Sequence, residues 1–178
     1  MEQFNEETAE RFTPEALSLS KPERKLIAVQ SRNSLEALRR ALDETYPEKT
    51  DIVVVATKVV PRRSAAPGPG LTNSDRALLT NVVKLAEEAG KPVRPLVVPT
   101  DDPATALARI ARAIGARELW MGPGRWRRPE QLINRIARAW SAAAAGEANS
   151  TPLTVRIVGD GQDVRRELTT SPARAFGA

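Results

Sequence analysis

The sequence of 178 residues contains no cysteine and no histidine. Without cysteine, disulfide bonds, thiolate nucleophiles and cysteine-ligated zinc sites are excluded. Without histidine, the chain lacks the side chain that most often serves as a general base near neutral pH and as a transition-metal ligand. These two absences favour a binding or regulatory protein over an enzyme. We therefore predict no catalytic residues and no metal site.

Aromatic residues and long apolar runs are also scarce. Phe, Trp and Tyr make up 4% of the sequence, whereas hydrophobic residues as a whole make up 41%, so the core is expected to be aliphatic. No run reaches the ~18 apolar residues that a membrane-spanning helix needs. Residues 1–7 are acidic and polar, unlike a secretory signal. The expected location is the cytoplasm.

The net charge of +5 is unevenly distributed along the chain. Positions 109–138 are rich in arginine and contain only two acidic residues, Glu118 and Glu130. Such a zone attracts phosphates, anionic lipid headgroups or acidic segments, although a solvated helix face has the same composition. Because few aromatic residues are interleaved with the arginines, we do not expect nucleic-acid binding.

Five short apolar runs alternate with four segments of helical periodicity. The runs span residues 25–30, 51–60, 92–99, 117–121 and 153–158. Strand–helix alternation of this kind predicts an α/β fold, with a five-stranded parallel sheet covered by helices on both faces. We expect a flexible acidic tail over residues 1–22, one domain over 23–168 and a disordered tail over 169–178.

The helix boundaries are predicted from capping residues. The first helix is expected to begin with a capping box from Asn33 to Glu36, and the second near Thr72. Asp102 before Pro103 predicts the start of the third helix. The expected apolar stripe of the first helix is Leu35, Leu38, Leu42 and Tyr46.

A further alternating run follows the fifth strand. Residues 159–162 read Gly-Asp-Gly-Gln, and residues 164–168 then alternate in polarity. Glycine-containing two-residue turns of this type favour a hairpin, so this run is expected to fold back on the fifth strand.

The candidate ligand site lies beyond the carboxyl ends of the first and fourth strands, where strand order usually reverses in such sheets. The start of the first helix directs free N–H groups toward this crevice, which favours an anion. Nearby arginines add positive charge, and a tryptophan is available to stack on a base. The predicted ligand-binding residues are Gln30, Ser31, Arg32, Asn33, Val59, Gly122, Gly124, Arg125, Trp126 and Arg127.

Better-known sites are absent at these positions. Residues 30–35 have none of the spaced glycines of a dinucleotide fingerprint, and no Walker phosphate loop occurs. Ser31 has no histidine to activate it as a nucleophile. The Asp101-Asp102 pair is explained by helix capping before Pro103. Residues 122–124 fit either a phosphate-facing turn or a plain turn.

Three stretches carry a resemblance to a known family: residues 35–42, 50–55 and 83–99. Together with the succession of five strands and four helices along the chain and the glycine turn at Gly122, they resemble the universal stress protein family. Within it they are most similar to the cytoplasmic stress-protein-like tail of bacterial amino-acid permeases. The resemblance implies a three-layer fold of the flavodoxin-like or adenine-nucleotide alpha-hydrolase-like type with strand order 3-2-1-4-5. It also implies a homodimer through the fifth strand and a membrane transporter as partner.

The resemblance implies ATP binding only for members that carry a complete glycine motif. Gly122 matches the first glycine of that motif, Arg125 stands at the second, and the closing glycine with serine or threonine is missing. Gln30 replaces the acidic residue that often ends the first strand. No cofactor is therefore assigned, and ATP or another adenine nucleotide stays an open ligand.

Two functions are consistent with these observations. The first is a non-enzymatic regulatory domain of the universal stress protein type, dimeric and associated with an amino-acid permease. The alternative is a sensor that binds the phosphates of a nucleotide or cyclic dinucleotide in the crevice between the first and fourth strands.

Overall fold

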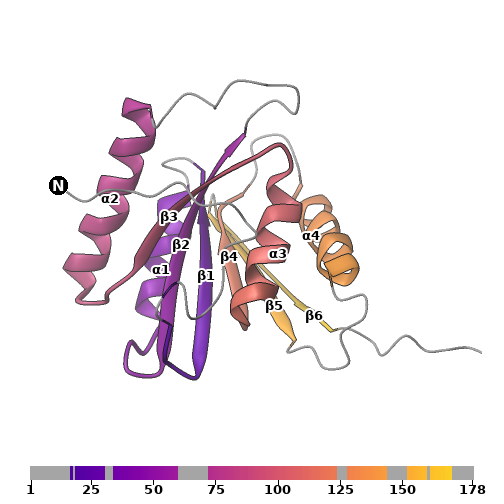
Figure 1. Ribbon diagram of the computed structural model, residues 1–178, viewed down its shortest axis with the longest axis horizontal. Helices are drawn as coiled ribbons and strands as arrows, with labels where there is room; N and C mark the ends of the chain where they lie inside the picture. Colours follow the sequence, from indigo (N-terminus) through magenta and orange to yellow (C-terminus); the bar gives the residue numbers. More distant parts are fainter. Residues whose placement is uncertain are drawn as a thin grey trace, which may run out of the picture.

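The computed structural model describes residues 17, 19–30, 34–59, 72–123, 128–143, 152–159 and 161–169. In these residues a single sheet lies between two layers of helices (Figure 1). The elements are β1 (Glu23–Val29), α1 (Leu35–Asp43), β2 (Thr50–Val59), α2 (Asn73–Ala89), β3 (Arg94–Thr100), α3 (Pro103–Ile114), β4 (Glu118–Met121), α4 (Pro129–Ala143), β5 (Leu153–Gly159) and β6 (Gln162–Leu168).

The strand order is β3-β2-β1-β4-β5-β6. The first five strands pair in parallel, and β6 runs antiparallel to β5. The predicted α/β fold and the order 3-2-1-4-5 are therefore confirmed, with β6 as a sixth strand. The hairpin predicted after the fifth strand is confirmed too.

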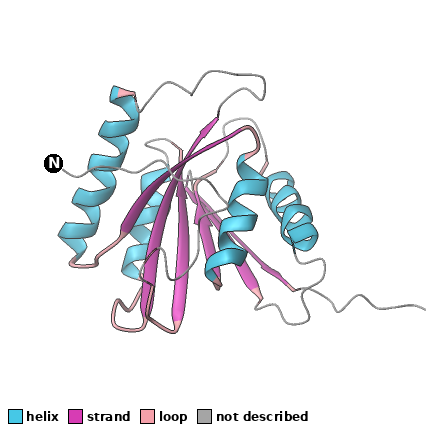
Figure 2. Ribbon diagram, viewed as in Figure 1, coloured by secondary structure: helices cyan, strands magenta, loops and turns pink. Residues whose placement is uncertain are grey.

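The helices cover opposite faces of the sheet (Figure 2). On one face, α1 and α2 pack over alternate residues of β1, β2 and β4, including Ile27, Val54 and Trp120. On the other face, α3 and α4 pack over the intervening residues, such as Leu26 and Val55. Because both faces of the central strands are covered, these strands are apolar at almost every position.

The capping residues set most helix ends as predicted. Thr72 and Asp75 form a capping box at the start of α2, and Gly90 ends that helix in the left-handed conformation. Asp102 caps α3 and Pro103 is its first residue. At α1 the N-cap is Ser34, so the helix begins one residue later than expected, and Asn33 lies outside the described residues.

The prediction that Tyr46 belongs to the apolar stripe of the first helix is wrong. The helix ends at Asp43, and Tyr46 is 78% exposed. The Thr45 hydroxyl donates a hydrogen bond to the Ala41 carbonyl, and the chain then turns toward β2 through bonds from Lys49 and Thr50 to Tyr46 O. The helical spacing stops at this turn, so the ring points into solvent.

The β5–β6 hairpin makes β6, rather than β5, the edge strand on this side of the sheet. Gly159 pairs with Gln162 across a two-residue turn, and the pairing continues to Leu153 with Leu168. Gly161 takes a φ of 75°, which the turn requires and glycine adopts without strain. The outer edge of β5, which the resemblance assigned to a second copy, is thus occupied by β6 of the same chain.

Residues that precede β1 already contact the domain. Leu17 is buried in the core formed with α3 and α4, and Leu19 packs beside it. The backbone N–H of Lys21 donates to the Asp51 carboxylate at 2.8 Å. Contacts with the domain thus begin before residue 23.

Within the described residues, none of the helices combines the length and apolarity needed to cross a membrane.

Candidate functional site

The candidate crevice lies at the carboxyl ends of β1 and β4. These strands are neighbours, with Ala28 opposite Met121, and the chain continues from them to Gln30 and to Gly122. From β1 the chain builds outward to β2 and β3, and it then crosses to β4 on the other side. Strand order therefore reverses here, which is where open α/β sheets bind ligands.

Gln30 fixes the local backbone on the β1 side of the crevice. Its Nε2 donates to the Thr57 hydroxyl of β2 at 3.1 Å, which ties the two strand ends together. Its backbone N–H donates to the Ser34 hydroxyl at 3.2 Å. Ser34 makes no side-chain cap bond to α1, so its hydroxyl does not satisfy the first N–H groups of that helix.

The structure places three of the predicted site residues. Gln30, Val59 and Gly122 stand at or just after the ends of the adjacent strands β1, β2 and β4. The Val59 side chain is outside the described residues, as are all atoms of the other predicted residues: Ser31, Arg32, Asn33, Gly124, Arg125, Trp126 and Arg127. Their roles therefore stay predictions.

Asp75 is held as a charged cap at the start of α2. Its carboxylate accepts the Thr72 N–H at 2.8 Å, and Lys58 Nζ lies 3.2 Å from Oδ2. Partial burial raises the pKa of Asp75, but the hydrogen bonds from Thr72 and Lys58 and the charge of Lys58 outweigh it. The net pKa lies below the usual value, so this group does not carry a proton near neutral pH.

Asp102 plays the same part at the start of α3. Its carboxylate accepts the Thr105 hydroxyl at 2.6 Å and the Thr105 N–H at 3.3 Å, and Arg135 lies 3.6 Å away. The hydroxyl bond is the main reason that the pKa of Asp102 is below normal. The capping interpretation of this residue is confirmed. Asp75 and Asp102 are therefore anionic caps rather than proton donors.

On the β4 side of the crevice, the backbone at Gly159 packs closely against the ring of Pro123. Gly159, at the end of β5, has a φ of 146°, and a Cβ placed on it would lie 2.7 Å from Pro123 Cδ. Glu36 Oε2 lies 3.7 Å from the same point. A carboxylate of the first turn of α1 thus stands beside the turn that follows β4. Any anion bound there would meet this negative charge.

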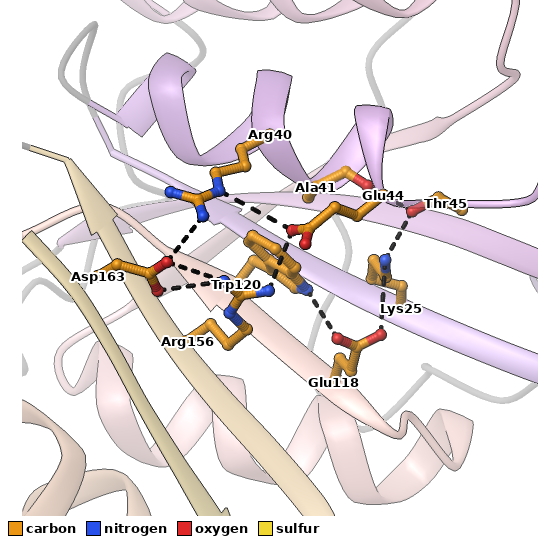
Figure 3. A network of polar contacts seen from close by, with 9 residues as sticks. All are labelled: Lys25, Arg40, Ala41, Glu44, Thr45, Glu118, Trp120, Arg156 and Asp163. Atoms are coloured by element: carbon orange, nitrogen blue, oxygen red, sulfur yellow. Dashed lines mark hydrogen bonds and ion pairs between the residues drawn. The ribbon is translucent and has the colours of Figure 1, made fainter.

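A second polar cluster lies under α1, away from the crevice (Figure 3). Trp120 is fully buried, and its Nε1 donates to Glu118 Oε1 at 3.3 Å. Lys25 Nζ lies 5.2 Å from the Trp120 ring centroid, and the Arg156 guanidinium carbon lies 4.1 Å from it. Both cations are within cation–π range of the same indole.

Arg156 joins this cluster to β6. Its side chain is 11% exposed; it contacts Glu44 Oε2 at 3.0 Å and both oxygens of Asp163 at 3.1 Å. Arg40 reaches the same Asp163 carboxylate at 2.9 Å. Glu36, Arg40 and Glu44 recur at four-residue spacing on α1, which places them along one side of the helix. That side faces the β5–β6 hairpin.

Lys25 is the most deeply buried cation of the cluster. Its Nζ donates to the Thr45 hydroxyl at 2.6 Å and lies 3.4 Å from Glu118 Oε2. Burial lowers the pKa of Lys25, and the neighbouring Glu118 only partly restores it. The cluster therefore has one ammonium whose charged form is disfavoured by its surroundings.

Sequence reasoning did not find this cluster. Arg156 interrupts the mostly apolar strand β5, and Lys25 and Glu118 are charged residues in β1 and β4, whose later residues are apolar. These charges within strands were the available signal. In the sheet, Lys25 lies opposite Glu118, and Trp120 lies opposite Arg156. The opposite charges on neighbouring predicted strands pointed to pairing, but only the strand order brings them together.

Comparison with known proteins supports the fold. No family model matches the sequence, and no curated protein matches it significantly. A universal stress protein solved in complex with cAMP has a TM-score of 0.53 and 18% identity, covering 78% of this chain and 98% of its own. The hypothetical protein MJ0577, the subject of a structure-based assignment of biochemical function, gives 0.55 and 15%, covering 79% and 99%.

A protein of the universal stress protein family from Burkholderia pseudomallei gives a TM-score of 0.50 and 21% identity, covering 77% of this chain and 96% of its own. Two of these three structural neighbours are named as universal stress proteins. At these identities the likeness establishes the architecture: this chain has the universal stress protein fold.

Proposed function

We propose that this chain is a non-enzymatic regulatory domain of the universal stress protein type. The observation that carries the proposal is the state of the carboxylates at the starts of α2 and α3. Asp75 and Asp102 are both bound as helix caps with lowered pKa values, so neither carries a proton to donate as a general acid near neutral pH. The absence of histidine and cysteine from the sequence supports the same conclusion.

A phosphate-release assay with ATP and Mg²⁺ tests the absence of enzymatic activity. We expect no release above the protein-free rate for the wild type. The D75N and D102N variants serve as controls, since each removes one of the two charged caps. Turnover by the wild type that either substitution abolishes would contradict the proposal.

A second candidate function is the binding of an adenine nucleotide or cyclic dinucleotide at the β1/β4 crevice. Its support is the strand reversal at this point together with the start of α1, whose first N–H groups Ser34 does not cap. The universal stress protein crystallised with cAMP has the same architecture. Gly122 directly follows β4 at this edge of the sheet.

Calorimetry with ATP, AMP, cAMP and cyclic di-AMP tests this candidate. We expect heat with at least one ligand, and its loss in Gly122→Val and Arg125→Ala. Arg109→Ala is the matched control for Arg125, because Arg109 is an exposed residue of α3. The absence of heat with all four ligands at high micromolar concentration removes the nucleotide proposal and leaves the regulatory one intact.

The partner of the regulatory domain is proposed to be a membrane transporter of the amino-acid permease type. The support is the resemblance of residues 35–42, 50–55 and 83–99 to permease tails. The neighbouring coding sequence is the simplest test. A permease gene beside this one, and co-purification of the two products, are the expected results. If the two proteins are co-expressed and the purified permease does not retain this chain, the proposed partner is contradicted.

A further inference from the structure

The two helical layers that cover the sheet differ in charge. Helices α3 and α4 pack against each other on one face (Figure 1), and their sequences contain four arginines and one acidic residue, Glu130. Helices α1 and α2, on the other face, contain four basic and five acidic residues. The layer formed by α3 and α4 is therefore the basic side of the domain.

The four arginines of this layer are here called the arginine face: Arg109, Arg112, Arg135 and Arg138. Two contacts between the helices align them. Arg135 lies 3.6 Å from Asp102 at the start of α3, and Arg112 donates to the Trp140 carbonyl of α4 at 3.1 Å. The two helices thus present their arginines side by side.

Two members of the arginine face, Arg109 and Arg138, lie between these contacts, one on each helix. Both are exposed, and neither forms an ion pair with another residue that the structure describes. Like charges held on one surface repel each other, and an anionic ligand relieves that repulsion. The arginine face is therefore suited to a segment with several negative charges.

An acidic segment of the same chain enters the domain on this side of the sheet. Residues 1–16, which precede the described residues, carry five glutamates and one arginine, a side-chain net charge of −4. Leu17 follows them directly; it is 6% exposed and buried in the core that α3 and α4 cover. The point at which the acidic segment meets the domain is thus fixed on the basic side.

We propose that residues 1–16 bind to the arginine face and cover it. The segment is long enough, because 16 extended residues span up to about 55 Å, whereas α4 is about 22 Å long. Attachment at Leu17 holds the glutamates at a high effective concentration near the arginines, so that ion pairs that are weak singly act together. In this position the segment keeps other anions from the arginine face.

Paramagnetic broadening of amide NMR signals tests where the segment lies. The native chain has no cysteine, so Asn5→Cys in the full chain carries a single nitroxide label. At about 0.01 M salt, where the Debye length is about 30 Å, we expect the signals of α3 and α4 to lose intensity and those of α1 and α2 to keep it. At about 1 M salt, where the Debye length is about 3 Å, the intensity in α3 and α4 should return.

Charge reversal on each helical layer provides matched variants of the labelled chain. R109E/R138E should abolish the broadening in α3 and α4. R76E/K84E makes the same change in net charge on α2, at two exposed residues that form no ion pair within the described part of the chain. The broadening should persist in this control, so a general effect of net charge would move both variants.

A second variant keeps the test decisive if R109E/R138E does not fold. It replaces the five glutamates of the segment by glutamine: E2Q/E6Q/E7Q/E10Q/E15Q. These positions precede Leu17, so every contact of the described domain is retained. The arginine face is unchanged in this variant, but its ligand is neutralised, and the broadening in α3 and α4 should again be lost.

Three results would overturn the proposal. The first is the absence of broadening in α3 and α4 at low salt, or broadening that survives the loss of the glutamates. The second is broadening of an isotope-labelled wild-type chain by the nitroxide of another chain, which would place the segment on a second copy. The third is binding of the wild type to phosphatidylserine vesicles without broadening within the chain, which would assign the arginine face to a membrane surface.

Discussion

The Arg156 guanidinium carbon lies 4.1 Å from the centre of the Trp120 ring, on the strand next to it. The contact is buried beneath α1, and the same guanidinium also binds Glu44 and Asp163. One side chain thus connects the core, the first helix and the last strand. On the α1 face, this arginine connects the end of the sheet near β6 to the helix.

Replacing Arg156 with glutamine should therefore destabilise the domain. The variant loses the ring contact and two ion pairs, but Glu44 and Asp163 are partly exposed and regain hydration. We expect a loss of about 2 kcal/mol in the free energy of unfolding, within the range of single substitutions that break a buried polar network. Urea titration measures it. The exposed register partner Arg165, changed to glutamine, should shift the value by less than about 0.5 kcal/mol.

The free energy of unfolding should depend on pH because the buried ammonium of Lys25 has a lowered pKa. Its pKa in the folded protein is lowered by burial, so between that value and 10.5 the unfolded chain binds more protons. Stability contributed by this residue therefore rises with pH in that window and is lost as pH falls through the folded pKa. Urea titrations at several alkaline pH values should show the wild type gaining stability relative to Lys25→Met. A constant difference across the window would contradict this.

Gly159 should not tolerate a side chain. A Cβ at this position meets Pro123 Cδ at 2.7 Å, and the φ of 146° is unfavourable for other residues. We expect Gly159→Ala to cost about 2–3 kcal/mol, since strain and a clash combine. Gly161→Ala is the control: its φ is 75° and nothing lies within 4 Å, so only about 1 kcal/mol of backbone strain is expected. Equal melting temperatures for the two variants would contradict the close approach.

Glu36 should weaken the binding of phosphate at the crevice. Its carboxylate lies beside the ends of β4 and β5, as judged from its 3.7 Å distance to the Cβ position of Gly159. Removal of this charge in Glu36→Gln should raise the affinity for ATP by roughly threefold to tenfold, the effect of about 1 kcal/mol of repulsion. Asp43→Asn, an exposed acid at the far end of α1, is the control and should leave the affinity unchanged. Calorimetry measures both.

The sequence predicted the fold because its signals are local. Apolar runs with helical segments between them define strands and helices whatever the rest of the chain does. Thr72 and Asp102 cap helices through bonds to residues three positions away, and so their roles were readable. The prediction for Tyr46 was wrong for the same reason, because a local periodicity does not show that the helix has already ended.

The sequence by itself determined the layers and the hairpin after β5, because each depends on neighbours along the chain. The strand order, and with it the switch point, was expected from the family resemblance and is observed only in the structure. Only the tertiary structure decided that Lys25, Trp120 and Arg156 share one buried cluster, since they come from three different strands. It also decided how β6 is held on the α1 face, because Asp163 meets Arg40 only when α1 packs across the hairpin. Contacts between distant segments depend on how the sheet is ordered and covered, which no local pattern encodes.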